Sequence, residues 1–272
     1  MAVANVERLI RVDRVDVLIG PYASDLTRAV VRVCRRHGRL FWNHGGAADD
    51  IHEEGSRVVG ILTPVGRYFA GLFEMLRTTD PRPENAVVVY RSGSGFGHLA
   101  ARGAEAMGRQ ARIRMATLTY SFLRDDLPKL IEELQQRSAD LVLSAGALED
   151  ECALARGLVA AGVRTKAFAL TAAAMHEFRQ ALGPDAKGFL GPSQWEPDAG
   201  YVADFGPAPP EAARRIRAMG APADYPAAQA YAACLIAQRC LEEADSADDE
   251  ALWRAACALD CTTFFGRFMI DP

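Results

Sequence analysis

The stretch R-S-G-S-G-F-G at residues 91–97 follows an apolar run and precedes a helical pattern. Such turns cradle a dinucleotide when they read G-x-G-x-x-G and an acid follows about 20 residues later. Here the pattern is G-x-G-x-G, His98 comes next, and the following strand ends A-T-L-T-Y without an acid. Two other interpretations remain: the glycines permit a tight turn, or the turn presents Tyr90, Ser92 and Phe96 to a ligand.

No other pattern indicates catalysis. The sequence contains no G-x-x-x-x-G-K-[ST], no G-x-S-x-G and no H-E-x-x-H, so a P-loop, a nucleophile elbow and a zinc-protease helix are excluded. The five histidines are dispersed and the six cysteines form no C-x-x-C pair, so no metal and no cofactor is expected. The acids Glu149, Asp150 and Glu151 open a helical pattern, where carboxylates favour the helix dipole. We therefore expect a protein that is not an enzyme.

Charge and hydropathy exclude further classes. The 272 residues carry a net charge of −4, and Lys and Arg are scattered rather than gathered in a stripe, so no nucleic-acid partner is expected. The chain is 50% hydrophobic, but it has no run of about 18 apolar residues that could cross a membrane. The N-terminal stretch lacks the apolar core of a signal peptide and is typical of an amphipathic helix.

Short apolar runs alternate with helical patterns along most of the chain. Strands are predicted at 15–20, 39–43, 57–62, 85–90, 112–120, 139–146, 166–171 and 188–195. Helices are predicted at 24–38, 65–78, 98–108, 126–137, 149–161, 227–244 and 248–258, with an irregular Pro- and Gly-rich region at 196–226. This alternation indicates βαβ units and parallel sheets covered by helices. Ligands of such sheets bind at the carboxyl ends of the strands, so the turns after residues 20, 43, 90, 146, 171 and 195 are candidate sites.

Several motifs occur in an order that resembles a known family. Gly20, Pro21 and Ser24 form G-P-x-x-S at a strand end, and a small polar turn follows the next strand at 43–47. Further motifs are F-G at 96–97, D-L-V-L-S-A-G-A-L-E-D-E at 140–151, G-F-L-G-P-S-Q-W at 188–195 and Y-P-A-A-Q-A-Y-A-A at 225–233. Over nearly its whole length the chain resembles the type I periplasmic solute-binding proteins, in particular the branched-chain amino acid (Leu/Ile/Val-binding) type that serves ABC transporters.

The resemblance implies an α/β fold of two lobes, each a parallel sheet flanked by helices, with the ligand in an interlobe cleft. It places residues 1–84 and about 222–261 in lobe I, and residues 85–221 and about 262–272 in lobe II. It also implies a non-enzymatic, periplasmic protein that passes a small molecule to the membrane permease of an ABC transporter. Two alternatives remain, a cytoplasmic small-molecule sensor on the same fold and a nucleotide-using α/β enzyme.

Family members begin with a strand, a helix and a second strand before the point at which this sequence starts. Lobe I is therefore expected to lack its initial strands, either in a fragment or through a misplaced start; a genuine start would place the protein in the cytoplasm. Loss of those strands would leave 15–20 as an exposed apolar sheet edge, which can pair with another chain. A homodimer through this edge is one expectation.

The resemblance also indicates which residues contact the ligand. In relatives a serine hydroxyl and backbone groups at the first two turns hold a carboxylate, and Ser24 or the Ala23 amide and the turn after Asn43 match those positions. The predicted ligand-binding residues are Tyr22, Ala23, Ser24, Asn43, Gly45, Gly46, Ala47, Phe96, Ala147, Thr171, Gln194 and Trp195. Gln194 would supply an amide and Trp195 a stacking face.

Three positions depart from the family pattern. Ala47 stands where relatives often have threonine, and Ala147 and about Ala172 stand where amino-acid binders have an aromatic residue and an ammonium-binding acid. A buried ammonium without a carboxylate is unfavourable by several kcal/mol. An α-amino acid ligand is therefore not assured, and a neutral or anionic ligand, including an aromatic one, fits as well. Simpler roles also exist for Ser24 as a helix N-cap and for Asn43 as a partner of backbone groups.

Overall fold

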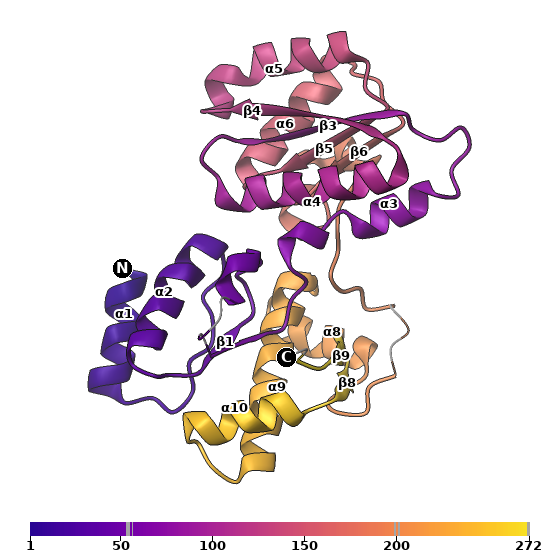
Figure 1. Cartoon of the computed structure of the whole chain (residues 1–272). Helices are drawn as coiled ribbons and strands as arrows, with labels where there is room; N and C mark the ends of the chain where they lie inside the picture. The colour runs from indigo at the N-terminus through magenta and orange to yellow at the C-terminus, as the bar shows by residue number, and fades with distance from the viewer. Residues whose placement is uncertain (53–54, 56, 199, 201, 271–272) are drawn as a thin grey trace. The chain divides into compact units, whose positions relative to one another are not determined.

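The computed structural model describes residues 1–52, 55, 57–198, 200 and 202–270, and the chain divides into two compact units (Figure 1). Unit 1 combines Met1–Thr63 with Gln194–Pro272, and unit 2 is the continuous segment Pro64–Ser193. The sequence placed these boundaries after residues 84 and 221 and assigned 262–272 to the other unit; residues 271 and 272 lie outside the described residues. The difference arises because the helices that follow Pro64 pack on the first long helix of unit 2.

Unit 2 is built on one parallel sheet. Its strands are β3 (Asn85–Arg91), β4 (Arg114–Tyr120), β5 (Leu141–Ala145), β6 (Ala167–Leu170) and β7 (Phe189–Leu190), in the order β4-β3-β5-β6-β7. Strand β5 is buried along its whole length, as expected of a central strand with both faces covered. The strand order reverses between β3 and β5, and this is where open parallel sheets bind ligands. The predicted parallel α/β architecture is confirmed here.

Helices cover both faces of this sheet. They are the 3₁₀ turn η3 (Val65–Arg67), α3 (Ala70–Leu76), α4 (Gly95–Ala111), α5 (Leu123–Arg137), α6 (Leu148–Ala160), α7 (His176–Leu182) and the 3₁₀ turn η4 (Gly183–Ala186). Leu130 of α5 and Leu154 of α6 pack in one cluster with Val87 and Val142 of the sheet. Figure 1 shows α4 on the other side of the strands from α5. The sequence predicted one continuous helix at 65–78 and did not predict α7.

Unit 1 draws its elements from both ends of the chain. They are α1 (Ala2–Arg8), the π-helical turn η1 (Leu9–Asp13), α2 (Ser24–Arg36), β1 (Phe41–Asn43), the 3₁₀ turn η2 (Asp49–His52), β2 (Val58–Gly60), α8 (Pro209–Ala218), α9 (Tyr225–Ala244), α10 (Asp249–Ala258) and the hairpin β8 (Cys261–Thr263) and β9 (Gly266–Phe268). Strands β1 and β2 pair in parallel. Asp249 joins the two chain segments: it accepts hydrogen bonds from the Leu40 amide at 3.0 Å and from Arg39 at 2.5 Å.

The strand predicted at 15–20 does not form a continuous ladder. Ile19 makes a single parallel bridge to Trp42, through hydrogen bonds from the Trp42 amide to the Leu18 carbonyl and from the Gly20 amide to the Trp42 carbonyl. The ladder is interrupted at Gly20, which adopts a φ of +90°, and at Pro21, which has no N–H to donate; pairing resumes in a second isolated bridge between Tyr22 and Gly45. The irregular region predicted at 196–226 likewise contains the helix α8, which begins with two prolines.

Two general features of the chain follow from the described residues. Among them, no helix combines the length and hydrophobicity that a membrane crossing requires. All six cysteines are free thiols; four are buried, and two are exposed on the surface of unit 1, Cys234 and Cys257.

Candidate functional site

The turn after β1 is held by Asn43, whose side chain is completely buried. Its Oδ1 accepts hydrogen bonds from the amides of Gly45 at 3.2 Å and Gly46 at 2.8 Å, and its Nδ2 donates to the Gly46 carbonyl at 2.8 Å. Three hydrogen bonds to its own turn use most of what a carboxamide offers. The role of Asn43 in this structure is therefore to shape residues 43–46, the simpler of its two interpretations.

Ser24 links the helix α2 to the same turn. The N-cap of α2 is Ala23 rather than Ser24, so the predicted capping role is wrong. The buried Ser24 Oγ instead accepts a hydrogen bond from the Ala48 amide at 3.1 Å. A hydroxyl that accepts one hydrogen bond still has its own proton to donate. Ser24 therefore stays available to an acceptor such as a ligand carboxylate.

The backbone at the two turns of unit 1 is in close contact. The Ala23 amide, a predicted ligand donor, instead donates to the Gly45 carbonyl at 3.0 Å. A Cβ on Gly45 would lie 2.6 Å from the Tyr22 Cα, and a Cβ on Gly46 would lie 2.6 Å from the Thr27 Cβ. Only glycine fits at both positions. Tyr22 is 45% exposed and Ala47 is buried. Through the contacts between the two turns, the structure brings together all seven residues predicted there: Tyr22, Ala23, Ser24, Asn43, Gly45, Gly46 and Ala47.

The glycine-rich turn of unit 2 serves as a helix start. Ser94 is the N-cap of α4, and its Oγ accepts the Gly97 amide at 3.0 Å. Gly97 packs so closely that an added Cβ would lie 2.8 Å from the Tyr90 Cβ and 2.9 Å from the Ala145 carbonyl oxygen. Phe96 is half-buried and meets Tyr68 edge-to-face at 5.8 Å between ring centroids. These contacts favour the structural interpretation of the glycines: Gly97 permits close packing, and Gly93, with a φ of +81° and open space around it, permits the tight turn.

The ends of β5 and β6 are connected by an acid that the sequence did not single out. Glu151 in the first turns of α6 is 1% exposed. Its Oε1 accepts hydrogen bonds from the Gly146 amide and the Thr171 hydroxyl, both at 2.9 Å, and its Oε2 accepts from the Ala172 amide at 2.5 Å. Burial raises the pKa of Glu151 to about 7, although these donors oppose the increase. Thr171 therefore faces Glu151, whereas Ala147 is exposed.

A second polar contact lies beside this acid. Tyr120, at the end of β4, donates its hydroxyl to Asp150 Oδ2 at 2.9 Å. Burial and the adjacent carboxylate together raise the pKa of Tyr120. An added Cβ on Gly146 would lie 3.2 Å from the Tyr120 hydroxyl and 3.3 Å from the Cγ of Glu151. Polar groups from three neighbouring elements therefore meet at the carboxyl edge of the sheet.

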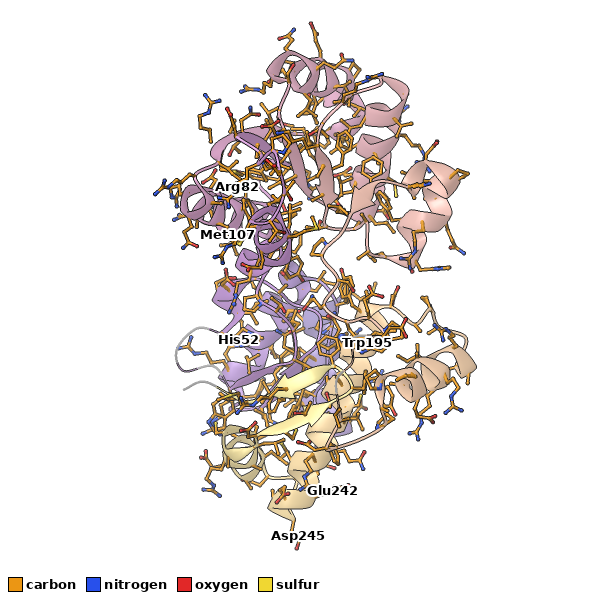
Figure 2. All side chains as sticks on the ribbon, turned by 90° about the vertical axis from the view of Figure 1, so that its right-hand side faces the viewer. His52, Arg82, Met107, Trp195, Glu242 and Asp245 are labelled. Atoms are coloured by element: carbon orange, nitrogen blue, oxygen red, sulfur yellow. The ribbon has the colours of Figure 1, made fainter. Side chains whose placement is uncertain are left out.

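The last two predicted residues lie in unit 1. Gln194 accepts a hydrogen bond from the Thr63 amide through its Oε1 at 2.6 Å. Trp195 is 2% exposed, and its indole N–H donates to the Phe264 carbonyl at 2.8 Å (labelled in Figure 2). Its ring meets Phe264 edge-to-face. The prediction that Trp195 offers a stacking face to a ligand is therefore wrong, because the ring is part of the unit 1 core.

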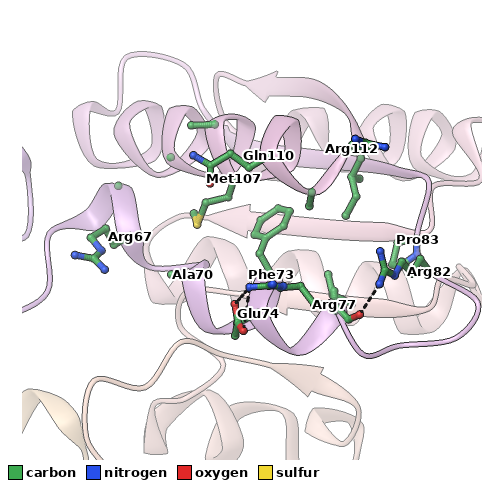
Figure 3. A pocket seen from close by; sticks show the side chains of 16 residues that line it. Arg67, Ala70, Phe73, Glu74, Arg77, Arg82, Pro83, Met107, Gln110 and Arg112 are labelled. Atoms are coloured by element: carbon green, nitrogen blue, oxygen red, sulfur yellow. Dashed lines mark hydrogen bonds and ion pairs between the residues drawn. The ribbon is translucent and has the colours of Figure 1, made fainter.

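A groove of about 650 Å³ in unit 2 lies apart from these residues. Figure 3 shows Phe73 of α3 and Met107 of α4 pointing into it, with Arg82 and Arg112 toward one end. Arg77 on its rim is paired with Glu74. None of the predicted ligand-binding residues lines this groove. Within the described part of the chain, no group of three or more His, Cys, Asp or Glu side chains is placed to hold a metal ion.

Three solved structures of bacterial binding proteins have a fold similar to that of this chain. A leucine-binding protein from Thermotoga maritima is 14% identical, with a TM-score of 0.88 over 99% of this chain and 76% of that chain. A Leu-, Ile-, Val-, Thr- and Ala-binding protein from Brucella ovis is 15% identical, with a TM-score of 0.86 over 99% and 71%. A Rhodopseudomonas palustris solute-binding protein in complex with benzoate is 19% identical, with a TM-score of 0.80 over 99% and 74%. The fold is therefore that of the two-lobed type I solute-binding proteins.

Comparison of the sequence with family models and curated proteins identifies the family of this chain. The family model described as periplasmic binding protein matches residues 1–272, so the chain belongs to that family. A Leu/Ile/Val-binding protein homolog of Brucella melitensis is 27% identical over 158 residues, which are 55% of this chain and 39% of the relative. The match thus spans well under half the length of this curated relative. The predicted family and fold are confirmed by these findings.

Proposed function

We propose that this chain is the solute-binding component of an ABC transporter and that it binds a small amino acid, carboxylate or amide without catalysis. The proposal rests on one observation above all: both units place ordered, partly buried polar turns at the carboxyl ends of parallel strands. In unit 1 these are the turns around Ser24 and Asn43, and in unit 2 the turns after β3, β5 and β6. Such edges are where open α/β sheets bind ligands.

The ligand class follows from which polar groups remain to recognise it. Ser24 keeps its hydroxyl proton, which suits a carboxylate or an amide oxygen. The buried Glu151 carboxylate already accepts hydrogen bonds from Gly146, Thr171 and Ala172, so it is not free to hold an ammonium group. We therefore favour ligands recognised through an oxygen acceptor, with the branched-chain amino acids and benzoates of similar proteins as first probes. A membrane permease as partner and a periplasmic location are parts of the same proposal.

A thermal-shift screen tests this proposal. The panel contains L-leucine, L-isoleucine, L-valine, benzoate, 4-hydroxybenzoate, benzamide and a set of nucleotides. A ligand at about 100 times its dissociation constant stabilises the folded state by roughly 2.7 kcal/mol, which raises the melting temperature by several degrees. We expect one of the acids or the amide to do so, and Ser24→Ala to weaken the effect. A shift produced by nucleotides alone would contradict the proposal.

A further inference from the structure

The carboxylate of Glu151 connects two turns that are separate in sequence. We propose that Glu151 is the positioning residue for the turns 146–147 and 171–172, and that its protonation changes how those turns are held. That these turns contact a ligand rests on the proposed function above. The link between Glu151 and the turns rests on hydrogen bonds alone.

The position of Glu151 on its helix explains how it reaches both turns. Helix α6 starts at Leu148, directly after β5, so a side chain in its first turns can fold back to the amide of Gly146. Strand β6 is the neighbour of β5 in the sheet, and Thr171 and Ala172 follow its last residue. One side chain between the two strand ends therefore ties both turns to α6, and it does so from a fully buried position.

A carboxylate suits this position better than any other side chain. Four donors converge on its two oxygens: the amides of Gly146 and Ala172 and the hydroxyls of Thr171 and Ser144. A glutamine would present one oxygen and one NH₂ group, so at least one donor would face another donor. Backbone amides cannot reverse their direction, whereas the Thr171 hydroxyl can both donate and accept. Thr171, which binds Oε1, and Ser144 are thus the groups able to adapt when Glu151 takes up a proton.

Protonation therefore changes the two turns unequally. The acid form must donate its new proton, and reversal of the Thr171 hydroxyl allows the Glu151 Oε1 to do so. Because Oε1 is also the acceptor for Gly146, that amide loses part of its hydrogen bond, while Ala172 keeps Oε2. Above the pKa of about 7 the carboxylate accepts from all of these donors; below it a proton on Oε1 weakens the hydrogen bond from Gly146 first.

The other titratable groups around Glu151 lie on β4, on α6 and on α7. The ionisable groups that interact electrostatically with Glu151 are Tyr120 on β4 and Cys152 on α6 itself, and Asp150 on α6 accepts the hydrogen bond from Tyr120. Burial raises the pKa of both the Tyr120 hydroxyl and the Cys152 thiol, so both stay neutral near pH 7. Ser144 on β5 and Thr171 after β6 face the carboxyl group as neutral hydroxyls. Helix α7, which packs against α6, carries His176 and Glu177 in its first turn, so a titration near neutral pH at these turns is assigned to Glu151 by the variant that replaces it and keeps both of these residues.

Nuclear magnetic resonance of the full chain labelled with ¹⁵N tests this without any ligand. We expect the amide signals of Gly146 and Ala172 to titrate with one common midpoint near pH 7. Hydrogen-exchange protection at Gly146, corrected for the intrinsic rate, should fall about tenfold as the pH drops through it, as for one lost hydrogen bond. Glu151→Gln should abolish the titration, whereas Glu149→Gln, an exposed acid on the same helix, should preserve it.

Thr171→Val provides a second variant that does not depend on the folding of Glu151→Gln. It removes one donor from the carboxylate and should raise the titration midpoint. Signals of Gly146 and Ala172 that do not titrate, or that titrate unchanged in both variants, would overturn the proposal. Because no ligand is present, this outcome is separate from a failure of the proposed function, which the thermal-shift screen detects.

Discussion

The substitution Asn43→Ala tests how much of unit 1 depends on a single carboxamide. The change removes the acceptor of the Gly45 and Gly46 amides and the donor to the Gly46 carbonyl. The site is buried, and Gly46 has neighbours close enough to exclude even a methyl group. Water therefore has little room to replace the lost partners.

The expected magnitude follows from these contacts. A buried polar group left without a partner destabilises by about 1–3 kcal/mol. The two contacts at 2.8 Å are short, and the third, at 3.2 Å, is at the long end of the usual range. We count the two contacts at 2.8 Å fully and assume that relaxation of the turn offsets part of the loss. The expected decrease in the free energy of unfolding of unit 1 is then about 3 kcal/mol.

Tryptophan fluorescence can follow the unfolding of unit 1 specifically, because unit 2 contains no tryptophan. The three tryptophans are Trp42, Trp195 and Trp253, and all lie in unit 1. Urea unfolding followed by tryptophan fluorescence therefore reports unit 1, and the shift of its midpoint at a constant slope gives the change in stability. Far-ultraviolet circular dichroism, measured in parallel, includes unit 2.

Asn85→Ala is the matched control. Asn85 is in unit 2, and its Oδ1 accepts a single hydrogen bond, from the Asp140 amide at 3.0 Å. This control should leave the fluorescence transition in place and cost unit 2 about 1 kcal/mol. A fluorescence midpoint for Asn43→Ala that moves no further than that of Asn85→Ala would refute the reasoning.

Three further predictions concern packing, pH and thiol exposure. Gly103→Ala should destabilise unit 2 by about 1–3 kcal/mol, because its Cβ would overlap the Gly66 carbonyl oxygen; Gly71→Ala, with open space around it, should be neutral or stabilising when urea unfolding is followed by circular dichroism. The folded-state pKa of Glu151 lies above its usual 4.5, so the folded state binds more protons between those values. The stability of unit 2 should therefore fall from about pH 4.5 to about 7, and Glu151→Gln should remove this slope in dichroism-detected unfolding. A thiol reagent should modify the two exposed cysteines quickly in the native protein and all six only after unfolding; rapid reaction of the buried four would contradict the packing.

Local patterns predicted most of unit 2. All five of its strands were expected within a few residues, except that β7 has only two paired residues. The helix α8 was missed because its two prolines were taken as signs of irregular structure, although proline is favourable in the first turn of a helix. The strand at 15–20 was overestimated for the opposite reason: its apolar residues fit a strand, but only Ile19 pairs, and Gly20 and Pro21 interrupt the pairing before it resumes at Tyr22.

The candidate site was harder to predict because its contacts join distant parts of the chain. The turn at 43–47 is local, and its polar character indicated its position correctly. Glu151 is different, since its partners at 171 and 172 lie 20 and 21 residues away. Beside two other acids at a helix start, it was indistinguishable from a surface carboxylate. Whether the predicted residues bind a ligand stays a prediction.

The continuity of unit 2 and the division of unit 1 have a consequence for biosynthesis. Domains that are continuous in sequence can fold as soon as they leave the ribosome. Residues 64–193 meet this condition, whereas residues 1–63 depend on later residues such as Asp249, which holds Arg39 and the Leu40 amide. Residues 1–63 therefore emerge before unit 2 but complete their fold after it. Between these two events their apolar residues stay accessible to chaperones, and the nascent chain is most exposed to aggregation in that interval.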